Sequence, residues 1–150
     1  MIARISNLLP VLAFLVAAPV AQVAWGGTDI GQVKTLAGMA HVERGDQELP
    51  VEPGFRLEAS DVVVTGEDSR LGITFIDNTR LSAGPNSRIE LENFQFDTTT
   101  HAGEFTARID KGTLSIISGQ IAKSHPDAMK VKTPTSVLAV RGTKFLVRVD

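Results

Sequence analysis

Most of the chain consists of short runs in which apolar and polar residues alternate, separated by turn residues roughly every 8 to 12 positions. A period of two places one side of each run against a core and the other side in water, as in a β-strand. The alternation is clearest near the last residues, where Phe145, Val147 and Val149 are interspersed with Lys144 and Arg148. No stretch shows convincing helical periodicity. The pattern predicts an all-β protein.

We expect about eleven strands, joined by turns that contain glycine, asparagine or aspartate. The expected strands are Ile30–Leu36, Met39–Arg44, Asp61–Thr65, Arg70–Ile76, Arg80–Ala83, Ser87–Glu92, Glu104–Asp110, Thr113–Ser118, Met129–Thr133, Ser136–Val140 and Thr143–Val149. Residues 97–103 and 119–127 are expected to be loops. The expected fold is a single jelly-roll-like β-sandwich domain over residues 28–150, and a short β-solenoid-like arrangement is the alternative.

The first residues have the character of a targeting segment. They carry Arg4, then the apolar run Leu8–Ala18, then a stretch of small residues. The apolar run is too short to span a bilayer. We therefore expect a signal peptide over residues 1–21, cleaved after Ala21 or Ala24, and a periplasmic protein without a permanent membrane span. An uncleaved membrane anchor is the alternative.

Composition narrows the chemistry further. The chain has no cysteine, which excludes disulfides, thiolate metal sites, cysteine nucleophiles and a lipoprotein anchor. Its formal net charge of −2 provides no basic surface, so nucleic acid is not an expected partner. Tyrosine is absent and Trp25 is the only tryptophan, so the core has to be built from aliphatic side chains and phenylalanine.

No catalytic constellation is evident. The sequence lacks the Gly-x-Ser-x-Gly and Ser-x-x-Lys patterns of serine nucleophiles, and it lacks phosphate-binding glycine loops. His41, His101 and His125 form no His-x-His or His-x-x-x-His pair, so neither a metal nor a cofactor is expected. Glu90 and Glu92 share one face of a strand, but an exposed acidic face explains them as well as a carboxylate pair does. The chain is predicted not to be an enzyme.

Two tripeptides contain an arginine followed by glycine. In Arg141-Gly142-Thr143, the glycine permits a tight bend before the last strand. The planar guanidinium of Arg141 has paired N–H donors that suit a carboxylate or a sugar. The same residues also suit a structural role, with Arg141 held by an internal aspartate, and this interpretation is favoured. Arg44-Gly45-Asp46 matches an integrin-recognition tripeptide, but it lies where a hairpin turn is expected.

Several ordered motifs carry a resemblance to a known family. The segment from Asp61 to Asp77, followed by Asn78-Thr79-Arg80-Leu81 and Asn86-Ser87, resembles the central pattern of FecR-type periplasmic domains. Thr133-Pro134, Val137, Val140 and Arg141-Gly142-Thr143 before Phe145-Leu146-Val147 resemble the closing motif of that family. Ser60-Asp61 is similar to its Gly-Asp-Val-like start. The resemblance covers roughly Ile30 to Asp150.

The resemblance implies a jelly-roll-like β fold and a role in cell-surface signalling. In the founding members the domain senses an outer-membrane transporter and relays its state to a cytoplasmic sigma factor. Because the apolar run begins at Leu8 and the chain stops at Asp150, we expect no direct anti-sigma activity here.

The function expected from the sequence is that of a non-catalytic module that binds another cell-envelope protein through an edge strand or an open sheet face. Arg141, Gly142 and Thr143 are the candidate binding residues, although the structural role is favoured for them. A carbohydrate or cell-wall binding module is the alternative, and it is weakened by the scarcity of aromatic residues. A small envelope hydrolase ranks last.

Overall fold

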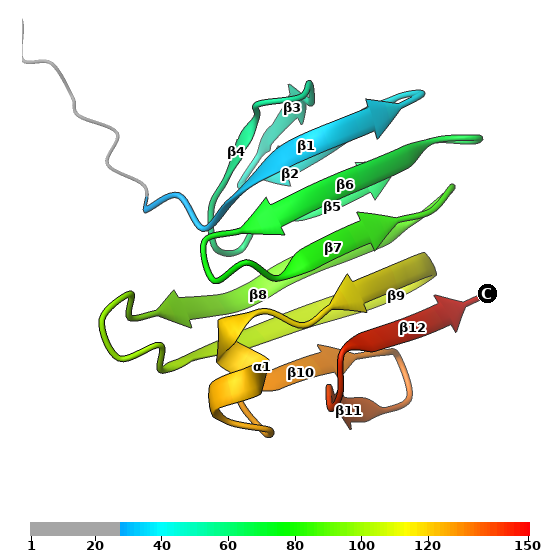
Figure 1. Cartoon of the computed structure of the whole chain (residues 1–150). Helices are drawn as coiled ribbons and strands as arrows, with labels where there is room; N and C mark the ends of the chain where they lie inside the picture. Colours follow the sequence, from blue (N-terminus) through cyan, green and yellow to red (C-terminus); the bar gives the residue numbers. More distant parts are fainter. Residues whose placement is uncertain (1–27) are drawn as a thin grey trace, which may run out of the picture.

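The computed structural model describes residues 28–150, in which twelve strands and one short helix are joined by turns and loops (Figure 1). The elements are β1 (Gly31–Ala37), β2 (Ala40–Arg44), β3 (Gln47–Pro50), β4 (Arg56–Leu57), β5 (Val62–Thr65), β6 (Arg70–Phe75), β7 (Arg80–Ala83), β8 (Arg88–Phe96), β9 (Gly103–Ile117), α1 (Gln120–Ser124), β10 (Met129–Lys132), β11 (Val137–Ala139) and β12 (Lys144–Val149). The prediction of an all-β protein is confirmed. The predicted signal peptide, residues 1–21, lies outside the described residues.

The strands form one sheet that curls into two facing layers, a half-barrel (Figure 1). The strand order is β3-β2-β5-β8-β9-β7-β6-β1-β4, with β10 and β12 also pairing with β9 and β11 pairing with β10. Every pairing is antiparallel except that of β9 with β10, which is parallel. Strands distant in sequence, such as β1 and β6, lie side by side, unlike the sequential stacking of a solenoid. The jelly-roll connectivity stays a prediction.

Strand β9 joins the two layers. Its first part pairs with β8 and β10 in one layer, and its last part pairs with β7 and β12 in the other. Gly112 lies between the two parts at a φ of +96°, and a Cβ there would come within 2.6 Å of Ser87. Only glycine combines that backbone conformation with so close an approach. Strands Glu104–Asp110 and Thr113–Ser118, predicted as separate, are therefore one strand that bends at Gly112.

The space between the layers is filled by a single cluster of buried apolar side chains. Three phenylalanines of this cluster pack against one another, with ring centroids 4.7 to 5.4 Å apart. Phe75 comes from β6 in one layer, and Phe94 and Phe105 come from β8 and β9 in the other. The aromatic packing thus connects the two layers, as expected for a chain that has no disulfide.

Phe94 reaches this core because β8 contains an irregularity. Strict alternation from Ile89 and Leu91 would turn residue 93 inward and residue 94 outward. The register with β9 shifts between Glu90 and Asn93, and Phe94 is buried as a result. Glu90 and Glu92 both remain on the outer side, where Glu92 binds Lys132 and Arg108. Glu92 is therefore a partner in a surface ion-pair network rather than half of a free carboxylate pair.

The structure adds three elements to the predicted ones. Strands β3 and β4 were not predicted, because they are short and lack apolar alternation. Helix α1 lies in the predicted loop 119–127 and has only five residues. It is held by buried Asp77, whose main-chain oxygen accepts a hydrogen bond from Gln120 and whose carboxylate accepts one from Ile121. Over residues 28–150, no helix has the length and apolar character required to cross a bilayer.

Candidate functional site

The free edges of the sheet are the first candidate for recognition, because an edge strand has unpaired backbone groups. Among the described strands, β3, β4, β11 and β12 each pair on one side only. Strand β4 has two residues and β11 has three. Strand β3 has four but ends in Pro50, which cannot donate a hydrogen bond. Strand β12 has six residues and no proline, which makes it the longest open edge of the four.

The side chains of β12 alternate as the sequence predicts. Val147 is buried, and Phe145 and Val149 pack against the core. Lys144 and Arg148 are exposed on the outer face, in agreement with their predicted orientation. One face of β12 therefore packs against the core, and the other face is exposed to solvent.

Leu146 is the unusual residue of the outer face. It lies between Lys144 and Arg148 and is 67% exposed. Ile117, which is paired with Lys144 across to β9, is 39% exposed on the same face. Leu146 and Ile117 together give the surface beside this edge a small apolar area.

The register of β12 shows which backbone groups are free. The amide of Ser118 donates to the main-chain oxygen of Thr143 at 3.0 Å, so Lys144 and Ile117 form a non-hydrogen-bonded pair. In such a pair the N–H and C=O groups point away from the partner strand. By the period of two, the backbone groups of Lys144, Leu146 and Arg148 all point away from β9. These three residues offer donors and acceptors to an added strand.

The predicted motif Arg141-Gly142-Thr143 forms the turn that leads into β12. Arg141 donates to Asp127 at 3.0 Å, and both side chains are more than 70% exposed. Gly142 has a φ of +87°, and its main-chain oxygen accepts a hydrogen bond from the Ser118 hydroxyl at 2.7 Å. The carboxylate that Arg141 meets is thus on the surface rather than internal. The fixed part of the motif is its backbone, which is anchored on Ser118.

The tripeptide Arg44-Gly45-Asp46 has a structural role. Gly45 and Asp46 form the two-residue turn between β2 and β3, in which Arg44 pairs with Gln47. Arg44 donates to Asp61, to Glu58 and to the main-chain oxygen of Arg56. The hydrogen bonds to Asp61 raise the pKa of Arg44, whereas burial of the side chain lowers it. The hydrogen bonds have the larger effect, so the pKa is raised on balance. The guanidinium of Arg44 is therefore used for hydrogen bonds within the domain.

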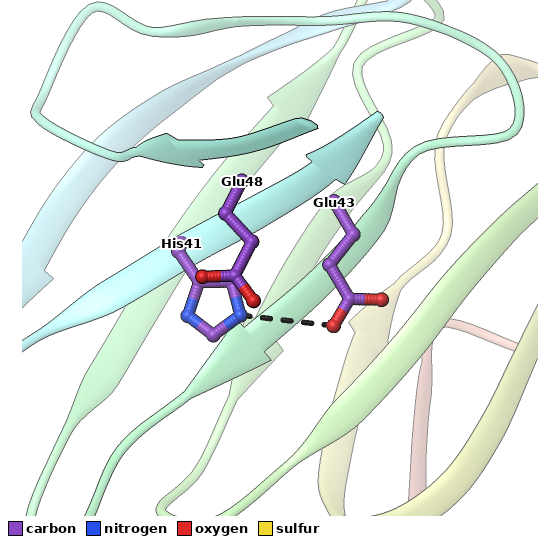
Figure 2. A group of neighbouring side chains, drawn as sticks. All are labelled: His41, Glu43 and Glu48. Carbon is purple, nitrogen blue, oxygen red and sulfur yellow. Dashed lines mark ion pairs between the residues drawn. The ribbon is translucent and has the colours of Figure 1, made fainter. Parts of the chain in front are cut away.

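The three histidines do not converge, but one of them has acidic neighbours. His101 and His125 are exposed and lie in other parts of the molecule. His41 lies on β2 with Glu43, and Glu48 of β3 completes a group whose potential ligand atoms are all within 4.8 Å of one another (Figure 2). A search for local histidine pairs does not detect this group, because its other two members are glutamates. The signal in the sequence is His-x-Glu followed by a two-residue turn, which brings Glu48 opposite Glu43.

The comparisons with known proteins agree with the resemblance in the closing motifs. The model of the FecR protein family matches residues 61–150, from the buried Asp61 through β12. The match begins later than Ile30, where we expected the resemblance to start. No curated protein and no solved structure matches the chain. Since the match covers more than half of the residues, the chain belongs to the FecR family, which is regulatory rather than enzymatic and is associated with signalling in the cell envelope.

Proposed function

We propose that the chain is a non-catalytic periplasmic module that binds another cell-envelope protein by adding an extended segment of that partner to β12. The observation that carries the proposal is the open edge of β12, where three residues direct free backbone groups outward. Strand addition uses those groups for affinity and the alternating side chains for specificity. The family's association with envelope signalling supports a sensing role for this contact.

The side chains of the edge indicate the chemistry of the partner. Lys144 and Arg148 are positively charged and flank the exposed Leu146. A matching segment would place acidic side chains opposite the two cations and an apolar side chain near Leu146, because opposite charges across a strand pair are favourable.

Self-pairing of β12 is disfavoured by the same residues. If two copies met in an antiparallel pair centred on Leu146, Lys144 of each would lie opposite Arg148 of the other. Like charges directly opposite each other destabilise a strand pair. The edge is thus protected against a second copy of the chain while it stays open to an acidic strand.

A glycan-binding function has less support. Residues 28–150 contain neither tryptophan nor tyrosine, and each phenylalanine in this range is buried or half-buried. Sugar-binding surfaces typically use exposed aromatic rings. No aromatic platform is present in the described part of the chain.

The experiment that tests the proposal compares proline substitutions at two edges. Leu146→Pro removes an outward N–H of β12, and prolines are tolerated on edge strands. Ala139→Pro on the open edge of β11 is the matched control. The amide of Val140 donates to the main-chain oxygen of Met129, so Ala139 and Lys130 form a non-hydrogen-bonded pair and the N–H of Ala139 also points outward. Both variants are checked for folding by circular dichroism and are then used to capture proteins from an envelope extract.

We expect the wild type and Ala139→Pro to retain the same envelope protein, and Leu146→Pro to lose it. The proposal is wrong if the folded Leu146→Pro variant retains the same proteins as the wild type, or if the wild type retains none. Periplasmic export is tested by mass spectrometry of the mature protein, which should begin at Gln22 or Trp25. An intact Met1 in the purified envelope protein would contradict export with cleavage.

A further inference from the structure

The hairpin of β2 and β3 places one imidazole and two carboxylates on the same face of the sheet. Glu43 and Glu48 are directly paired across the hairpin. His41 lies two residues before Glu43 on the same strand, so its side chain points to the same face. The Nε2 atom of His41 is 3.8 Å from Oε1 of Glu43, and the carboxylate of Glu48 is directed toward the imidazole (Figure 2).

This arrangement concentrates negative charge. Two like charges directly opposite each other destabilise a strand pair. Arg88 of β8 donates to both carboxylate oxygens of Glu43, at 2.8 and 2.6 Å, and offsets one of the two charges. Glu48 has no ion pair with any residue in the range 28–150. A cation bound between His41 and the two glutamates would offset the remaining charge.

Arg88 also prepares Glu43 as a ligand. The two hydrogen bonds fix the plane of the carboxylate, while each oxygen retains a further lone pair. Metal-ligating carboxylates commonly have such a hydrogen-bonding partner behind them.

The donor set selects the class of metal. Calcium and magnesium prefer sites made only of oxygen ligands, whereas an imidazole combined with carboxylates suits zinc and similar transition metals. A surface depression of about 430 Å³ beside the hairpin is lined by His41 and Glu48, which leaves room for a water molecule as a fourth ligand. The geometry points to a divalent transition-metal site of the zinc type, formed by His41, Glu43 and Glu48, with Arg88 as a positioning residue for Glu43.

The proposed metal site is separate from the β12 edge and is not required for the proposed function. Strands β2 and β3 lie at one end of the sheet order, and β12 pairs with β9 far from them in that order. Loss of metal binding and loss of partner binding are therefore separate outcomes, measured with different variants.

The test is isothermal titration calorimetry of the untagged protein with zinc chloride, together with thermal unfolding in the presence and absence of zinc. We expect one zinc ion per chain and a rise in Tm with zinc. His41→Ala and Glu48→Gln should each weaken zinc binding by about tenfold or more, a loss at least as large as that seen when an outer hydrogen-bonding partner is removed. Arg88→Gln should weaken it by about tenfold, because Glu43 is then free to turn away.

The control variant is His125→Ala, which removes an exposed histidine away from the hairpin and should bind zinc like the wild type. Without zinc, Glu48→Gln should be at least as stable as the wild type, because one of two opposed charges is removed. The inference is overturned if the wild type binds no zinc, if folded His41→Ala binds it as tightly as the wild type, or if His125→Ala reduces binding as much as His41→Ala.

Discussion

Arg44 donates two parallel hydrogen bonds to Asp61, from Nε to Oδ1 at 2.8 Å and from Nη2 to Oδ2 at 2.7 Å. The contact ties the end of β2 to the residue that precedes β5. Asp61 is only 1% exposed, and its carboxylate also accepts a hydrogen bond from the amide of Glu58. Because a buried carboxylate requires a partner, this pair is central to the stability of the first part of the fold.

Replacement of Arg44 by alanine should therefore lower the free energy of unfolding. Asp61 would stay buried with only one hydrogen-bond donor, at a cost of about 1–3 kcal/mol. Arg44→Lys should recover only part of the loss, since an ammonium group cannot form the two parallel bonds. Urea unfolding followed by circular dichroism measures both changes.

The control for this prediction is Arg56→Ala. Arg56 pairs with Asp29 at 2.8 Å, but its side chain is 73% exposed. Exposed pairs contribute at most about 1 kcal/mol. An equal loss of stability in Arg56→Ala and Arg44→Ala would show that the burial of Asp61 is not the reason for the effect.

Replacement of Ser60 by glycine should stabilise the folded protein. The φ of Ser60 is +72°, a conformation that costs a residue with a Cβ roughly 1 kcal/mol. Ser60→Gly is expected to raise the free energy of unfolding by up to about 1 kcal/mol. The neighbouring Ala59→Gly, at a position without a positive φ, should lower it, and a gain in both variants would contradict the argument.

The ion pair of Glu43 with Arg88 should make stability depend on pH. The folded pKa of Glu43 lies below its ordinary value of 4.5, mainly because of the hydrogen bonds from Arg88. The stabilisation is therefore complete above the unfolded pKa and is lost as the pH falls through the folded pKa. The difference in unfolding free energy between the wild type and Arg88→Gln should be largest near neutral pH and should shrink below about pH 4.5.

Urea unfolding at a series of pH values measures this difference. The pKa of Asp97 is also lowered, by hydrogen bonds from the amides of Thr100 and Thr99, but it contributes equally to both proteins and cancels. A difference that stays constant between neutral and acidic pH would mean that the pair does not stabilise the fold through the charge of Glu43.

In the closing motif Arg141-Gly142-Thr143, Gly142 should contribute more to the free energy of unfolding than Arg141 does. Arg141→Ala removes an exposed pair with Asp127 and should cost no more than about 1 kcal/mol. Gly142→Ala forces a Cβ into a backbone with φ of +87° and should cost about 1–2 kcal/mol. Thermal unfolding of the two variants is the measurement. A larger loss for Arg141→Ala would indicate that the side chain, not the turn, holds β12 in place.

The sequence by itself determined the strands that have one buried face and one solvent-exposed face. In β12, the alternation of Phe145, Val147 and Val149 with Lys144 and Arg148 was sufficient to assign both faces, because the pleat of a strand alone decides which way each side chain points. The ordered motifs from Asp61 to Val147 were also sufficient to indicate the family. Both inferences depend on local patterns, which a single sequence contains.

The tertiary structure decided the features that depend on which strands become neighbours. Strand β3 has no apolar alternation and exists because it pairs with β2 across a two-residue turn. Helix α1 is held by Asp77, more than 40 residues earlier. The shift of register in β8 that buries Phe94 follows from its pairing with β9. Pairing between distant segments is set by the packing of the whole core, which local alternation does not encode.

The candidate sites belong to this second group. Lys144, Leu146 and Arg148 are readable as outward residues, but only the strand order shows that no neighbour covers their backbone groups. His41 and Glu43 are close in the sequence, but only the hairpin register brings Glu48 to them, so that the potential ligand atoms of all three lie within 4.8 Å of one another. A free edge and a cluster of donors are properties of the folded arrangement, because they depend on which backbone and side-chain groups are left without a partner once the sheet has formed.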